Sequence, residues 1–151
     1  MLDFTKLIKN SLISVTLLFG ASSAFAGNLT IEINDIRNTK GKLQVAVYNQ
    51  EQAYKKNSLD KAYAAFSLSV NSKRNAITLR DIPKGKYAVS LFHDENSNGQ
   101  METNVANMPK EGYGTSNADD KYDELSFSQA SVQVSDKNRI VKVKMFYMGE
   151  K

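Results

Sequence analysis

The sequence predicts an all-β fold, a seven-stranded antiparallel Greek-key sandwich with one long ordered loop. Most of the chain alternates apolar and polar residues, which is the period of half-buried strands. Turn residues separate most of these runs, whereas a parallel sheet would need crossover helices between its strands. The chain has 151 residues, and we expect one β-sandwich domain over 27–151 once an N-terminal leader is removed.

Residues 1–26 have the pattern of a cleavable signal peptide. Two lysines make a basic start, an apolar stretch follows at 12–19, and the small-x-small motif Ala-Phe-Ala ends at Ala26, before Gly27. A membrane anchor is the alternative interpretation, but the apolar run is shorter than the ~20 residues that a bilayer span needs. We therefore expect a periplasmic or secreted protein that keeps no membrane span after cleavage between Ala26 and Gly27.

The seven predicted strands follow from the positions of the alternating residues. They fall at 29–33, 43–47, 66–70, 77–79, 86–93, 130–134 and 141–147. A turn that contains Pro83 and Gly85 precedes the fifth strand, which is apolar on both faces and is therefore expected to be central in its sheet. The stretch 50–65 has no clean periodicity, and it predicts one short helix or an ordered loop.

Composition and charge narrow the classes of function. The chain has no cysteine and one histidine, which excludes disulfides, thiol chemistry and a zinc site of several Cys or His ligands. The formal net charge is +4, yet eight acidic residues and only two lysines lie between 94 and 128. A basic body favours anionic envelope partners, and a solvated surface with an acidic loop is the alternative. We expect no nucleic-acid partner, because no aromatic-basic motif is present.

The clearest chemical signal follows the fifth strand. Residues 94–128 make a 35-residue connection, well beyond the about 12–15 residues at which an irregular loop calls for an explanation. This connection opens with Asp-x-Asn-x-Asn-Gly-x-x-Glu, whose oxygens suit a hard cation such as calcium. The candidate metal ligands are Asp94, Asn96, Asn98, Gln100 and Glu102.

The 94–104 loop also departs from an EF-hand. Val105 stands where an EF-hand loop has its bidentate glutamate, and no paired helices flank the loop. With so few carboxylates, calcium affinity is expected in the weak range, a Kd of about 10⁻⁴–10⁻³ M. In the alternative interpretation Asn, Gly and Asp only make consecutive turns, with their side chains bonded to local backbone. The sequence leaves both interpretations open.

Four further residues are candidates for a ligand surface, namely His93, Glu111, Tyr113 and Asn117. Glycines flank Tyr113, and they either display its ring to a ligand or let the backbone fold over the mouth of the sandwich. His93 shares strand parity with apolar residues, so it is interpreted either as a half-buried structural imidazole under the loop or as a catalytic base. A hydrolase that uses loop carboxylates or His93 is an alternative function, although no Gly-x-Ser-x-Gly elbow is present.

Two motifs in combination resemble a known family. They are Ile82-Pro-Lys-Gly-Lys-Tyr-Ala-Val-Ser-Leu-Phe-His-Asp-Glu-Asn-Ser-Asn-Gly and Met108-Pro-Lys-Glu-Gly-Tyr-Gly-Thr-Ser-Asn. Over roughly 29–147 the chain is similar to the exported bacterial proteins known as domain of unknown function 2141. The resemblance implies a small periplasmic sandwich of the transthyretin-like, or prealbumin-like, type, and it carries over no activity, cofactor or substrate.

From the residues and the resemblance together, we expect an exported periplasmic binding or accessory protein. Its ligand would be an envelope protein, a glycan or a small molecule, bound at the end of the sandwich that carries the long loop. Calcium is the one cofactor that the 94–104 loop indicates. A purely structural envelope protein is the alternative that predicts no ligand preference.

Overall fold

The structure is a computed structural model that describes residues 26–148. Its strands are β1 (Ala26–Asn34), β2 (Lys42–Tyr48), β3 (Ala64–Ser69), β4 (Asn75–Pro83), β5 (Gly85–Asp94), β6 (Gly112–Thr115), β7 (Val132–Val134) and β8 (Arg139–Lys144). Its helical elements are α1 (Glu51–Lys55), the 3-10 helix η2 (Leu59–Lys61) and α2 (Phe127–Ala130). The predicted signal peptide lies outside the described residues, except for Ala26.

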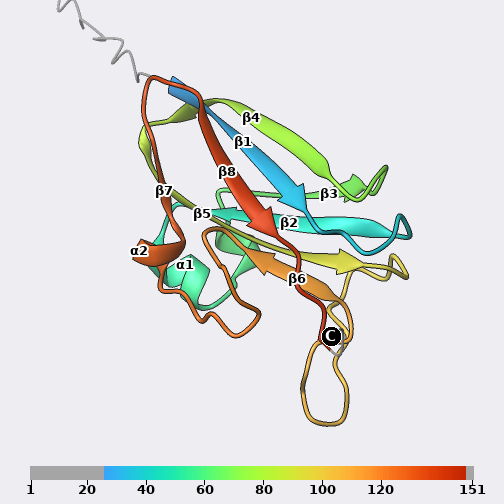
Figure 1. The fold of residues 1–151 in the computed structure, drawn as a ribbon. Coiled ribbons are helices and arrows are strands. Elements are labelled where there is room, and N and C mark those ends of the chain that lie inside the picture. Colours follow the sequence, from blue (N-terminus) through green and yellow to red (C-terminus); the bar gives the residue numbers. More distant parts are fainter. Residues whose placement is uncertain (1–25, 149–151) are drawn as a thin grey trace, which may run out of the picture.

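The strands form two sheets (Figure 1). One has three strands in the order β4-β1-β8, and the other has the order β3-β2-β5-β6, with β7 also paired to β5. Figure 1 shows α1, α2 and the β5–β6 connection beyond the second sheet, on the side away from the first. This mostly-β architecture confirms the predicted fold class and the central position of β5, while the Greek-key, prealbumin-like topology stays a prediction.

The core lies between the two sheets, where the alternating residues of each strand point inward. In β1 the residues Leu29, Ile31 and Ile33 are fully buried, whereas the residues between them keep some exposure. The main partners from the other strands are Leu43, Val45, Val47, Tyr87, Val89, Leu91, Val134, Val141 and Val143. Since each fully buried Val, Leu or Ile contributes about 1.5–3 kcal/mol, this cluster is the main source of stability.

One strand pairing corrects the wholly antiparallel prediction. β1 and β8 run parallel, with Ile31 opposite Val141, while the other strand pairs are antiparallel. A tight hairpin turn enforces antiparallel pairing, but β1 and β8 come from opposite ends of the chain and share no turn. The connection between β7 and β8 instead passes from one sheet to the other.

The described residues contain eight strands rather than the seven predicted, because β6 lies inside the expected long loop. β6 pairs with β5, and Tyr113 lies opposite Phe92. The 94–128 excursion is therefore two shorter connections, one before β6 and one between β6 and α2. Ala130, predicted to begin a strand, ends α2, whose N-terminus is a capping box made by Ser126 and Gln129. α1 and η2 agree with the short helix expected within 50–65.

Candidate functional site

A buried carboxylate closes the base of the β5–β6 connection. Glu111 is 4% exposed, and its Oε1 accepts a hydrogen bond from the Glu95 amide at 3.0 Å while its Oε2 accepts one from the Glu102 amide at 3.2 Å. Burial of a carboxylate is tolerated when hydrogen bonds replace its lost hydration. Glu111 was expected on a ligand surface, and the structure corrects this. Its buried side chain joins two parts of the connection, at Glu95 and at Glu102.

His93 has a structural position of the same kind. Its imidazole is fully buried, and Nε2 lies 2.7 Å from the Lys40 carbonyl oxygen, which can only accept. Nε2 therefore carries a proton, and in the neutral ring Nδ1 accepts from the Tyr147 hydroxyl at 2.9 Å. No part of the His93 ring reaches solvent, so the ligand-surface expectation for His93 is corrected. The imidazole has a structural position, but it is buried more deeply than the half-buried ring that was expected.

Arg37 extends this polar cluster beyond the histidine. Its Nε donates to Glu95 Oε1 at 2.7 Å, and its guanidinium lies 4.6 Å from the centre of the Tyr147 ring. Burial raises the pKa of the Glu95 carboxyl, but hydrogen bonds from Asn38 and Arg37 outweigh this effect and hold the pKa below its ordinary value. The segment after β1, the start of the loop and the chain after β8 are thus tied together by side chains.

Asp94, the first predicted metal ligand, begins the loop as a buried acceptor. Oδ1 accepts the Asn98 amide at 3.0 Å, while Oδ2 accepts the Gly99 amide at 2.8 Å and the Gln44 side-chain amide at 2.8 Å. Burial raises the pKa of this carboxyl, yet the hydrogen bonds lower it to a net value below the ordinary one. Asp94 therefore fixes the course of the chain as far as Gly99.

The other predicted ligands close the loop on itself. The side-chain oxygens of Asn96 and Asn98 accept the backbone amides of Asn98 and Gln100, at 3.1 Å and 2.8 Å. Their side-chain nitrogens donate to Glu102 Oε1, at 2.9 Å and 3.3 Å. Within residues 26–148 no cluster of three or more His, Cys, Asp or Glu is placed to hold a metal ion. The turn geometry is thus present, and calcium binding stays a prediction.

A groove of about 410 Å³ lies on the outer face of the sheet that contains β5. Its floor is made of small outward-facing side chains, Ala46, Ala65, Ser67, Ser90 and Thr115. Larger apolar groups rise around this floor, namely Leu59, Phe92, Met101 and Tyr113. None of the residues that line the groove is charged.

The connections on either side of the sheet shape this groove. Gly99 and Met101 of the 94–104 loop, called the Asp/Asn loop below, line one edge of the groove. The side chain of Leu59 in η2 lines the groove on the side of the helices. Tyr113 lines the groove, and its hydroxyl donates to the Lys121 carbonyl oxygen at 2.5 Å; its part in binding a ligand stays a prediction. Asn117 lines a different hollow, and its side-chain amide donates to the Gln129 carbonyl at 2.9 Å.

The floor of the groove was missed by sequence reasoning, although a signal for it exists. Near the middle of β2, β3 and β5 the outward-facing positions are Ala46, Ala65, Ser67, Ala88 and Ser90, where the solvent-facing side of an antiparallel sheet ordinarily carries larger polar residues. The other sheet follows that ordinary pattern, because its outer face carries Glu32, Arg80, Lys142 and Lys144. The two outer faces of one molecule therefore differ in kind.

The comparisons with known proteins identify a family and nothing narrower. No curated protein and no solved structure matches the chain. Among residues 26–148, no helix has the length and apolarity that crossing a bilayer requires. A family described as uncharacterized protein conserved in bacteria (DUF2141) matches residues 31–142, which begin within β1 and end within β8 and so include both the Asp/Asn loop and the groove. The match confirms the resemblance seen in the sequence, and the chain belongs to this family.

Proposed function

We propose that the protein is an exported bacterial envelope protein that binds a small, mainly apolar ligand in the groove on the outer face of the β5-containing sheet. The observation that carries this proposal is the uncharged lining of the groove in a chain of which 24% is charged. Ligand sites are typically concave, about 300–1,000 Å³ in volume, and mostly apolar with a few polar groups. The groove has these properties.

The dimensions of the groove favour a small ligand over a protein partner. Its volume of about 410 Å³ lies within the about 300–1,000 Å³ of small-molecule sites, whereas a stable protein partner typically takes a broad surface of about 800 Å² from each side. Gln44, Ser67 and Thr115 supply hydrogen-bonding groups along an otherwise apolar surface. Export is supported by the signal-peptide pattern of residues 1–26.

Calcium binding by the Asp/Asn loop belongs to the same proposal. Two of the predicted ligands, Asp94 and Glu102, are carboxylates, and the oxygens of Asn96 and Asn98 each accept one hydrogen bond and keep a second lone pair. Such oxygens suit calcium. An ion held there would stiffen the stretch that brings Met101 to the groove.

A groove-filling substitution tests the proposed site. The protein is purified from the periplasm of an expression host, and native mass spectrometry identifies any co-purified molecule. ¹⁵N NMR with 1-octanol as the probe then follows the amides of Ser90 and Thr115. Ala65→Trp places an indole in the groove, and Ala76→Trp is its matched control, because Ala76 is an exposed strand residue on the outer face of the other sheet.

We expect saturable octanol shifts at Ser90 and Thr115 in the native protein and in Ala76→Trp, and their loss in Ala65→Trp. Both alanines are exposed, so neither substitution overpacks the core. The proposed function is wrong if octanol leaves both amides unshifted in the native protein, or if Ala65→Trp binds as the native protein does.

A further inference from the structure

A second hollow continues the groove toward α1 and α2. Its volume is about 560 Å³, and it shares Asn57, Ser90 and Thr115 with the groove described above. The two hollows are therefore one trough along the same face of the sheet. A ligand longer than the groove extends into the second hollow.

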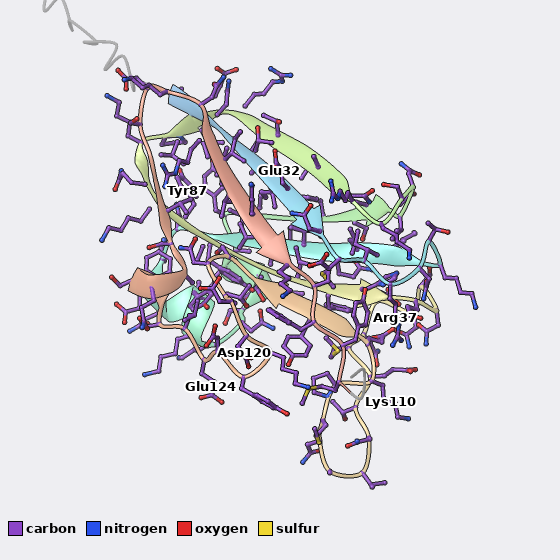
Figure 2. The ribbon with its side chains drawn as sticks, viewed as in Figure 1. Glu32, Arg37, Tyr87, Lys110, Asp120 and Glu124 are labelled. Atoms are coloured by element: carbon purple, nitrogen blue, oxygen red, sulfur yellow. The ribbon has the colours of Figure 1, made fainter. Side chains whose placement is uncertain are left out.

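The chemistry changes sharply along this trough. The groove lining has no charged side chain, whereas the second hollow is lined by Glu51, Asp123 and Glu124 and by a single cation, Lys55. Figure 2 shows Asp120 and Glu124 near each other and apart from Lys110. One end of the trough thus carries an excess of negative charge, and the other end is apolar.

Within residues 26–148, the carboxylates of the second hollow form no ion pair. Asp123 is held by the backbone amides of Asp119 and Asp120, at 2.8 Å and 2.9 Å, and these bonds lower the pKa of its carboxyl. Across residues 26–148, neither Glu51 nor Glu124 forms an ion pair. The three carboxylates are accordingly available to a cation that enters from solvent.

Two aromatic rings stand in the same hollow as these carboxylates. The rings of Tyr54 and Phe127 have centroids 5.9 Å apart. The Tyr54 hydroxyl donates to the Leu125 carbonyl at 3.0 Å, which fixes the ring. Aromatic faces attract organic cations through their quadrupole, and ammonium groups are recognised by such rings beside carboxylates. The two rings also pack against Tyr48 and Ala53, and the parts of them that line the hollow place aromatic surface beside the carboxylates.

We infer that the trough binds an amphipathic organic cation, with its alkyl part over the uncharged groove and its ammonium group among Glu51, Asp123 and Glu124. The inference rests on the proposed function and adds the charge of the ligand to it. An anionic head group is repelled by the same carboxylates, and a neutral one gains nothing from them. A small molecule with one cationic group is preferred to a basic peptide, because the negative charge of the trough is confined to one end.

Three probes of equal chain length test this inference. Octyltrimethylammonium, 1-octanol and octyl sulfate are titrated separately, each below its aggregation concentration, and the amides of Ser90 and Thr115 are followed by ¹⁵N NMR. We expect the ammonium probe to bind about tenfold more tightly than octanol, because several carboxylates act on it in a partly enclosed site. Octyl sulfate is expected to bind more weakly than octanol.

Two pairs of charge-removing substitutions separate the effect of the site from the effect of net charge. Glu51→Gln with Glu124→Gln is expected to remove the preference for the ammonium probe and to leave octanol binding unchanged. Asp81→Asn with Asp136→Asn changes the net charge equally but lies outside both hollows, so we expect it to keep the preference. Retention of the preference in the first double variant, or its loss in both, overturns the inference.

The outcomes also separate this inference from the proposed function. Equal binding of octanol and the ammonium probe in the native protein overturns the inference about charge and leaves the apolar site intact. If none of the three probes shifts the Ser90 or Thr115 amide, the proposed function fails, and the inference fails with it.

Discussion

Replacement of Glu111 by glutamine tests whether one buried carboxylate holds the connection between β5 and β6. Both of its oxygens accept backbone amides, from Glu95 at 3.0 Å and from Glu102 at 3.2 Å. A carboxamide keeps one acceptor and turns an NH₂ group toward the other amide. A hydrogen bond to a charged group contributes about 1.5–3 kcal/mol and a neutral one about 0.5–1.5 kcal/mol. The substitution should therefore cost about 2–4 kcal/mol of unfolding free energy.

Urea denaturation measures this loss, and Glu124→Gln is its control. Glu124 is exposed and, within residues 26–148, its carboxylate forms no ion pair, so the same chemical change there should alter the unfolding free energy by less than about 0.5 kcal/mol. If the loop opens without global unfolding, hydrogen exchange at the Glu95 and Glu102 amides should accelerate instead, about 30-fold for 2 kcal/mol. A native urea midpoint together with native exchange at both amides would refute the reasoning.

Three shorter predictions concern the same end of the molecule. Calcium should raise the melting temperature and Asp94→Ala should abolish the rise, whereas superimposed melting curves in calcium and in chelator would show that the loop is only a turn. Hydrogen bonds outweigh burial and hold the pKa values of Asp94 and Glu95 below their ordinary 3.8 and 4.5, so the stability these carboxylates provide is complete above those values and is lost as pH falls through the lower folded-state values. In chelator, the urea concentration at the unfolding midpoint should fall as the pH is lowered from about 5 to about 3. The fall should be smaller in the double variant Asp94→Asn with Glu95→Gln, and an equal fall in the native protein and the variant would contradict this origin. Gly112→Ala places a Cβ 2.2 Å from the Tyr147 ring and should cost about 1–3 kcal/mol, a prediction that an unchanged urea midpoint would rule out.

Alternating residues predicted most strands but not β6, for an identifiable physical reason. Its inward positions are Gly112 and Gly114, which carry no apolar side chain that could reveal a period. A Cβ on Gly112 would meet the Tyr147 ring, and one on Gly114 would lie 2.6 Å from the Lys144 carbonyl oxygen. The space that a strand ordinarily fills with its own side chains is filled here by another segment, and that segment is distant in the sequence.

The buried polar residues were placed less well than the strands. Polarity indicates exposure in a sequence, and His93, Asp94 and Glu111 are nonetheless buried because each has hydrogen-bond partners. The partners of His93 are the carbonyl of Lys40 and the hydroxyl of Tyr147, which lie more than 50 positions away on either side. Periodicity reports which face of a strand a residue occupies, and it cannot report such partners or the direction in which two strands pair.

The hydrogen bonds of the Asp/Asn loop and the shape of the groove depend on each other. Asp94 holds Gly99 by a hydrogen bond, and Gly99 and Met101 form part of the groove lining. A ligand in the groove should therefore bind the loop with this bond formed, the closed loop, in preference to the loop with it broken, the open loop. Apparent affinity then scales with the fraction of molecules whose loop is closed. If closure is favoured by more than about 1.4 kcal/mol, at least about nine molecules in ten are already closed, and a modest weakening of the loop barely changes affinity. Only a substitution that brings the free energy of loop closure near zero should lower ligand affinity and loosen the loop together. Glu111→Gln is expected to do so if the loop is of marginal stability.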